Sequence, residues 1–304
     1  MQKTILLAAC TFCVCCTLIP LSLTAQQTVI SPKETLTAPG AEVQKVADGF
    51  SFTEGPAADA DGNIYFVDDP NSKIHFYSPA DKKLSVFVEH SEHANGMYFD
   101  RKNNLLLVCE GGTGSIVSYN KKAERTLIAA TFEGKRFNKP NDLWLDPKGG
   151  IYFTDPVYGK EFKRIHSGEH VYYILPDRKT VRRVINDMIK PNGIVGTRSG
   201  KTLYVTDQAA GKVWRYTIEP DGNLTEKTLF ANTGVDGMTL DERGNVYVTE
   251  KDVVIFNGAG EKMQRIQFPE VPSNVCFGGK DKKTLYVTAR KGLYSIRMNV
   301  AGLE

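Results

Sequence analysis

The sequence predicts an all-β fold, a six-bladed β-propeller whose blades are four-stranded antiparallel sheets. Three observations predict it. A short apolar phrase recurs six times, successive copies lie 39 to 52 residues apart, and a turn precedes each copy. A repeat of roughly 40 to 50 residues that holds several strands is typical of propeller blades. Because a propeller is one closed ring, the 304 residues are expected to form one large domain rather than two.

The recurring phrase has the composition of a buried strand, because each copy joins aromatic or leucine side chains to β-branched ones. The residues that mark the six copies are Tyr65, Leu106, Tyr152, Tyr204, Tyr247 and Tyr286. A strand and a polar turn come before each marker, and a third strand comes after it. Most copies also contain a fourth strand, so each repeat supplies one complete blade.

The two ends of the chain predict how the ring closes. The last copy has only three strands, and a spare alternating segment over residues 42–47 precedes the first copy. This N-terminal strand is expected to complete the last blade, because pairing there removes an open sheet edge. The propeller domain is therefore expected over residues 42–304, after an N-terminal linker over residues 26–41.

The first 25 residues differ from the rest of the chain. Lys3 is followed by an apolar stretch that ends in small residues at Ala25, the pattern of a signal peptide. We expect residues 1–25 to be removed, and the protein to be exported, periplasmic or secreted, without stable membrane insertion. An uncleaved anchor is one alternative. Lipoprotein anchoring at Cys10 is less favoured, because the apolar segment before it is short.

Composition excludes several function classes. Hydrophobic residues make up 41% of the chain and charged residues 24%, as in a folded globular protein. The formal net charge is +3, and no basic block or arm stands out, so nucleic-acid binding is not expected. Outside the signal segment, Cys109 and Cys276 fall in the second and last repeats. They are too far apart on the ring for a disulfide, so two packed thiols are expected.

A polar residue opens every repeat at nearly the same distance from its marker. It stands 11 or 12 residues before the marker, and it is Glu, Asp or Asn in all six copies. The six residues are Glu54, Asn95, Asn141, Asn192, Asp236 and Asn274. Equivalent positions lie at equal depth around the channel, so the sequence predicts a ring of oxygen-bearing side chains at one mouth.

The donor set of this ring indicates a hard cation. Two carboxylates balance one divalent ion, four amides add neutral oxygens, and neither His nor Cys is present. This composition favours Ca²⁺, while Zn²⁺, Mn²⁺ or Mg²⁺ are possible occupants. The alternative is a water-filled channel whose polar residues only cap strand ends and form turns.

Five phrases carry a resemblance to a known family. They are FTEGP (52–56), KPNDL (139–143), YFTDPVYG (152–159), PNGI (191–194) and VDGM (235–238). In this order and at blade spacing, the set resembles the gluconolactonase, regucalcin and luciferin-regenerating enzyme family, over roughly residues 42–298. The phrases around Asn141 and Tyr158 are most similar to those of the gluconolactonase branch.

The resemblance implies a hydrolase of carboxylic ester bonds that opens a small-molecule sugar lactone with the help of one divalent cation. Carried over by motif, the metal ligands are Glu54, Asn192 and Asp236. Asn141 binds the metal in some relatives and the substrate in others. Asp236 is also implied as the general base that activates water.

Substrate contacts are expected next to the ring. Arg136 and Lys139 stand just before Asn141 and could hydrogen-bond sugar hydroxyls or a carboxylate, and Asn95 is inferred from its ring position. Two other functions remain open. One is a different lactonase, esterase or phosphotriesterase on the same metal site, and the other is a propeller that only binds partners.

Overall fold

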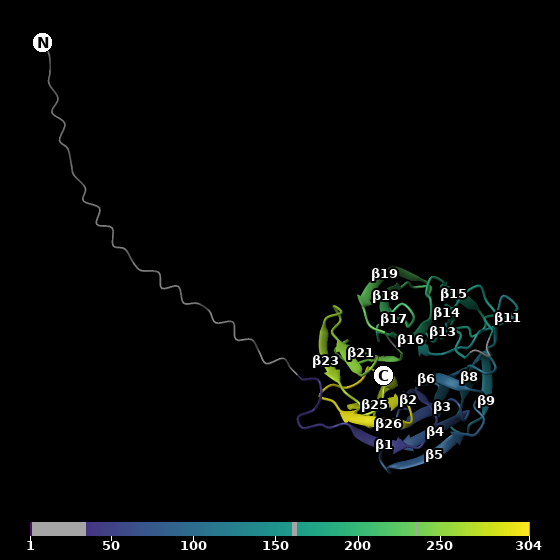
Figure 1. Cartoon of the computed structure of the whole chain (residues 1–304). Coiled ribbons are helices and arrows are strands. Elements are labelled where there is room, and N and C mark those ends of the chain that lie inside the picture. The colour runs from purple at the N-terminus through teal and green to yellow at the C-terminus, as the bar shows by residue number, and fades with distance from the viewer. Residues whose placement is uncertain (2–34, 160–162, 235, 304) are drawn as a thin grey trace. The chain divides into compact units, whose positions relative to one another are not determined.

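The computed structural model describes residues 35–159, 163–234 and 236–303, together with Met1. The predicted signal peptide therefore lies outside the described residues, apart from Met1. From Thr35 onward the described residues form one compact unit. Six four-stranded antiparallel sheets are arranged around a central axis (Figure 1). The predicted six-bladed propeller is confirmed, and all the described elements are strands.

Each blade runs from the channel outward in chain order. Blade 1 consists of β2 (Thr53–Ala58), β3 (Ile64–Asp68), β4 (Lys73–Ser78) and β5 (Lys83–Val88). Blade 2 consists of β6 (Ala94–Asp100), β7 (Leu105–Glu110), β8 (Ser115–Tyr119) and β9 (Arg125–Ala129). Blade 3 consists of β12 (Leu143–Leu145), β13 (Ile151–Asp155), β14 (His170–Ile174) and β15 (Val181–Ile185). Blade 4 consists of β16 (Pro191–Gly196), β17 (Thr202–Asp207), β18 (Lys212–Ile218) and β19 (Leu224–Ala231). Blade 5 is β20 (Met238–Leu240), β21 (Val246–Thr249), β22 (Val253–Phe256), β23 (Lys262–Ile266).

Blade 6 combines the two ends of the domain. Its first three strands are β24 (Pro272–Gly278), β25 (Thr284–Ala289) and β26 (Gly292–Arg297), and its outermost strand is β1 (Gln44–Asp48). The antiparallel pairing of β1 with β26 confirms that an N-terminal strand closes the ring. The described part of the expected linker also packs on this blade: Leu36 is buried, and Thr37 bridges Met298.

The core lies between the blades. Each innermost strand contacts those of both neighbouring blades, so β2, β6, β12, β16, β20 and β24 form a closed circle. The aromatic residues that mark the repeats fill the space between adjacent sheets. Tyr65 stacks on Phe99 of blade 2, with ring centroids 5.8 Å apart, and Tyr247 meets the edge of Phe277 of blade 6 at 5.2 Å. A buried aromatic contributes a large apolar area, which explains its recurrence at this position.

Three further features complete the fold. A two-stranded hairpin, β10 (Thr131–Phe132) and β11 (Lys135–Arg136), joins blades 2 and 3 and was not predicted. Cys109 and Cys276 are buried thiols with no disulfide between them, as expected. Within the described residues, no helix has the length and apolarity that crossing a membrane would require.

Candidate functional site

The six ring residues lie at the same end of the innermost strands. Four are within the strands β2, β6, β16 and β24, and the other two directly precede β12 and β20. All except Asp236 are less than a tenth exposed, and Asp236 is partly exposed. The innermost strands of blades 1, 2, 4 and 6 also shift register at or beside the ring residue. Such bulges bend the strand and redirect the side chain.

Buried threonines fix the ring from one blade to the next. Each belongs to the repeated phrase, two residues after its marker, and each is fully buried. Their hydroxyls donate to backbone carbonyls of the next blade, from Thr154 to Asn192 (2.7 Å), from Thr206 to Asp236 (3.4 Å) and from Thr249 to Ser273 (3.0 Å). The spacing of adjacent ring residues is thus set by side chain–backbone hydrogen bonds.

In most copies of the repeated phrase, an acidic residue stands three positions after the marker. Its side chain holds the loop that leads into the ring. In three blades this Asp accepts backbone N–H bonds from two consecutive residues, two or three positions before the ring residue. The pairs are Asp68 with Ser51 and Phe52, Asp155 with Asn138 and Lys139, and Asp207 with Ile189 and Lys190. The repeated acids are therefore structural, although their residue type also suits catalysis.

Glycine after a ring residue allows the blades to approach closely. A β-carbon at Gly193 would overlap the carbonyl oxygen of Asp236 in the next blade. Gly55 likewise abuts the carbonyl of Asn95, and it adopts a positive φ of 49° that disfavours other residues. Both glycines keep consecutive ring residues in direct contact around the channel.

The two ring carboxyls, Glu54 and Asp236, interact strongly. Burial raises the pKa of Glu54 well above its usual range, the charge of Asp236 raises it further, and the Gly55 N–H lowers it. Burial raises the pKa of Asp236 to about 7, although the Asn192 amide and the charge of Arg290 lower it. Two neighbouring carboxyls that oppose each other's ionisation are stabilised in their charged forms by a nearby cation. This electrostatic arrangement fits a divalent ion.

The orientation of Asn192 also fits a cation. Its Nδ2 donates to the Tyr158 hydroxyl at 2.8 Å, and this hydroxyl donates to Oε1 of Gln208 at 2.7 Å. The Lys190 ammonium lies 4.6 Å from the centre of the Tyr158 ring. With the amide nitrogen held in this way, Oδ1 of Asn192 is left available as an oxygen donor. Sequence reasoning placed Tyr158 in a motif but gave no signal for Gln208, which lies in the next blade.

The remaining amides of the ring differ from one another. Asn274 uses Oδ1 to accept from the Val275 N–H at 2.7 Å, and its Nδ2 donates to Asp142 at 3.5 Å. Its side chain is therefore directed at a neighbour across the channel. Asp142 stands where four other blades have Gly, and burial raises its pKa to about 8. Asn141 lies beside it, with its backbone carbonyl accepting from the Gly96 N–H at 2.6 Å.

A pocket of about 300 Å³ opens beside Asp236. Its wall includes Phe52, Gln208, Ser273 and Arg290, and the Arg290 guanidinium lies 5.5 Å from the centre of the Phe52 ring. Arg290 has a positive φ of 46°, so the backbone is strained where it presents this cation. Phe52 opens the phrase over residues 52–56 but was given no role by sequence, and Arg290 was not singled out because it comes from a loop outside the repeated phrase.

The two cations expected to contact substrate lie elsewhere. Arg136 donates to the carbonyls of Phe137 at 3.2 Å and of Gly112 at 3.3 Å. Lys139 is partly buried, with its backbone N–H bound to Asp155. Neither residue lines the described pocket beside Asp236. Their substrate role stays a prediction.

The donors fit a hard cation and not a soft one. Over the described ranges, no three His, Cys, Asp or Glu side chains are grouped so that they could hold a metal ion. Within the ring, the charge of Asp236 acts on Glu54, and the Asn192 amide acts on Asp236. A set that is all oxygen, with two negative charges, suits Ca²⁺ and comparable ions.

Comparison with known proteins identifies the family. The family model described as SMP-30/Gluconolactonase/LRE-like region matches residues 52–291. The gluconolactonase of Zymomonas mobilis is 28% identical over 295 residues, covering 86% of this chain and 82% of that protein. The pentonolactonase XacC of Haloferax volcanii is 28% identical over 255 residues, covering 79% and 81%. A solved structure provisionally called a gluconolactonase is 32% identical with a TM-score of 0.82, covering 88% and 96%. The chain therefore belongs to the SMP-30/gluconolactonase/LRE-like family.

Proposed function

We propose that this protein is a cation-dependent lactonase that opens sugar lactones to hydroxy acids. The observation that carries the proposal is the interacting carboxyl pair of Glu54 and Asp236, beside an Asn192 whose amide oxygen is left for a ligand. Relatives named gluconolactonase and pentonolactonase support a lactone as substrate. Glu54, Asn141, Asn192 and Asp236 would hold the cation, and Ca²⁺ is the ion that we propose.

In this mechanism the residues of the chain position the lactone and move one proton. A bound cation would supply Lewis-acid polarisation of the lactone carbonyl. Asp236 accepts a proton from water while the water oxygen bonds to the carbonyl carbon. The ring C–O bond then breaks, and the released oxygen takes that proton, which yields the hydroxy acid. Only the ionised form of Asp236 can begin this sequence.

The pocket beside Asp236 supplies groups that suit a hydroxylated ring. Gln208 and Arg290 offer hydrogen-bond partners, and Phe52 offers an apolar face for the C–H side of a sugar. Asn95 and Asn141 lie on the ring itself and are proposed to bind hydroxyls of the substrate. Arg136 and Lys139 would act at the outer edge, where charge attracts a polar ligand.

Removal of metal is expected to abolish turnover of D-glucono-1,5-lactone, measured as proton release. Adding Ca²⁺, Zn²⁺, Mn²⁺ or Mg²⁺ in turn should restore activity, with Ca²⁺ most effective at the lowest concentration. The physical reason is that the ring carboxyls lose their counter-charge when the ion is removed.

Two variants of blade 1 make the test specific. Glu54→Gln should show little restoration by any metal, whereas Glu89→Gln, which removes an exposed carboxylate paired with Lys73, should behave like the parent. Turnover that persists in stripped protein, or full activity in Glu54→Gln, would contradict the proposal. Hydrolysis of paraoxon without lactone turnover would favour the phosphotriesterase alternative.

Tyr158→Phe tests whether the orientation of Asn192 matters. Removing the hydroxyl leaves Nδ2 of Asn192 without the partner at 2.8 Å, so the amide can rotate. We expect the concentration of cation that gives half-maximal activity to rise about 10-fold, in the range found for residues that orient ligands. Activity at saturating cation should recover. An unchanged cation requirement would show that Tyr158 does not orient this ligand.

The proposal of an exported protein depends on sequence alone. Residues 1–25 have the charged start, apolar stretch and small-residue end of a signal peptide. Mass spectrometry of the mature protein from its native host should find an N-terminus near Gln26 if the segment is cleaved.

A further inference from the structure

A second cavity lies at the opposite end of the innermost strands from the ring. It has a volume of about 590 Å³. Asp100 ends β6, Leu145 ends β12 and Gly196 ends β16, and all three line it. The ring residues open these same strands or directly precede them. At about 3.3 Å per residue, Asp100 lies roughly 17 Å along the strand from Asn95. The cavity is therefore separate from the candidate metal site.

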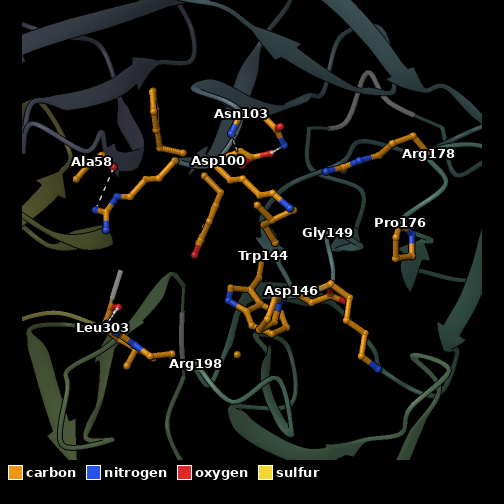
Figure 2. Close-up of a pocket in the computed structure, with 18 residues that line it drawn as sticks. Ala58, Asp100, Asn103, Trp144, Asp146, Gly149, Pro176, Arg178, Arg198 and Leu303 are labelled. Atoms are coloured by element: carbon orange, nitrogen blue, oxygen red, sulfur yellow. Dashed lines mark hydrogen bonds between the residues drawn. The ribbon is translucent and has the colours of Figure 1, made fainter.

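Positive charge predominates around this cavity (Figure 2). Among the residues that the structure describes, two carboxylates line it, and both already accept hydrogen bonds. Asp100 accepts from Asn103 at 2.8 Å, and Asp146 accepts from the Tyr173 hydroxyl at 2.6 Å. Its cationic residues are Arg101, Lys102, Lys148, Arg178 and Arg198. The cations outnumber the acids, so an anion would be attracted.

Three of these cations are held by backbone carbonyls. Their bonds run from Arg101 to Ala58 (3.4 Å), from Lys148 to Pro220 (2.6 Å) and from Arg198 to Leu303 (2.6 Å). A carbonyl orients a cationic side chain without neutralising its charge. The positive charges of these lining residues therefore stay available to a ligand, as anion-binding sites require.

Arg178 supplies the most specific indication. Its Nη1 atom is buried and has no hydrogen-bond partner within the part of the chain that the structure describes. Its backbone has a positive φ of 58°, which is unusual for a side chain of this size. Figure 2 shows the side chain extending toward the part of the cavity where Asp100 and Asn103 lie. A buried donor without a partner is costly, and a ligand oxyanion would satisfy it.

Much of the rest of the wall is apolar. Trp144 is 3% exposed and its indole packs against Gly196, and Pro147, Pro176 and Leu303 also line the cavity. We propose that the cavity binds a small organic anion, with its carboxylate or phosphate at Arg178 and its ring against the wall that contains Trp144. The volume lies in the range of small-molecule sites. This inference goes beyond the lactonase proposal and does not depend on it.

The chain contains a natural reporter for this test. It has two tryptophans, of which Trp144 lines the cavity and Trp214 lies in β18 near Lys227. In a Trp214→Phe background, the fluorescence of Trp144 can be titrated with glucuronate and with glucose 6-phosphate. These share a sugar ring and differ in the anionic group, so they distinguish carboxylate from phosphate. The titrations use metal-stripped protein that also carries Glu54→Gln, so that ligand binding at the ring of oxygen-bearing side chains does not contribute to the fluorescence change.

We expect a saturable fluorescence change with at least one of the two sugars. Arg178→Gln and Arg198→Gln should each weaken binding at least about 10-fold, the loss expected for one charge-assisted hydrogen bond. Arg182→Gln, which removes an exposed cation from the same blade, should leave binding unchanged. Flat titrations with both sugars would overturn the proposal. The proposal would also be overturned if Arg178→Gln and Arg198→Gln bound the sugar as tightly as the parent protein, or if inorganic phosphate bound as tightly as glucose 6-phosphate.

Discussion

Replacing Asp236 with Asn is expected to lower kcat for lactone hydrolysis by about 10²- to 10⁴-fold, the usual contribution of a general base. The substitution keeps the shape of the side chain but removes its ability to accept a proton from water. The carboxyl lies in the pocket beside Phe52 and Arg290, where a reacting molecule can reach it. Initial rates by proton release, with circular dichroism to verify the fold, would measure the effect.

The same variant separates the two roles assigned to Asp236. If the residue acts only as a ligand, saturating cation should restore kcat, whereas a base should leave kcat low at every cation concentration. In the parent enzyme, activity should be present above the pKa of Asp236 and lost as pH falls through it. Burial places that pKa at about 7, and a bound cation lowers it, so the acid limb should lie below pH 7. Near-normal kcat in Asp236→Asn would rule out its role as base.

Gly193→Ala is expected to have the second large effect, because the new β-carbon would overlap the carbonyl oxygen of Asp236. That oxygen belongs to the backbone and also accepts from Thr206, so it cannot move without displacing the ring. We expect cation affinity to fall at least about 10-fold. Overpacking should also lower the free energy of unfolding by about 1–3 kcal/mol. Calorimetric titration with Ca²⁺ and thermal unfolding would measure the two effects.

Gly258→Ala provides the matched control. The nearest atom that its β-carbon would meet is 3.9 Å away, and its φ is not in the left-handed region. This variant should retain both cation affinity and stability. Parent-like cation binding by Gly193→Ala would mean that the ring tolerates expansion at this point, contrary to the close approach of blades 4 and 5.

The fold could be predicted because each blade packs against the next in the same way. An aromatic marker such as Tyr247 must fill the gap to the next sheet, so its spacing records the blade period. The closing strand was predictable because an unmatched three-strand repeat leaves an edge. The hairpin of β10 and β11 could not be predicted in this way, since it occurs once and has no periodic signal.

The ring could be predicted for the same reason, as a property shared by all blades. The differences between the individual ring residues could not be predicted from the sequence. Asn274 and Asn192 have the same residue type and position, yet one is joined to Asp142 and the other to Tyr158. Those partners lie far away in sequence and meet only in the folded ring. Gln208 and Arg290 were missed because loops outside the repeat bring them to the pocket.

The closure of blade 6 has a consequence for biosynthesis. β1 is the first strand of the propeller in chain order, and its partner β26 is the last. Until β26 is available, β1 stays unpaired, while the blades between them can form from local hairpins. Contacts between such distant segments are slow to form. Ring closure is therefore expected late in folding, as is the contact between β2 and β24, the innermost strands that carry the first and last ring residues.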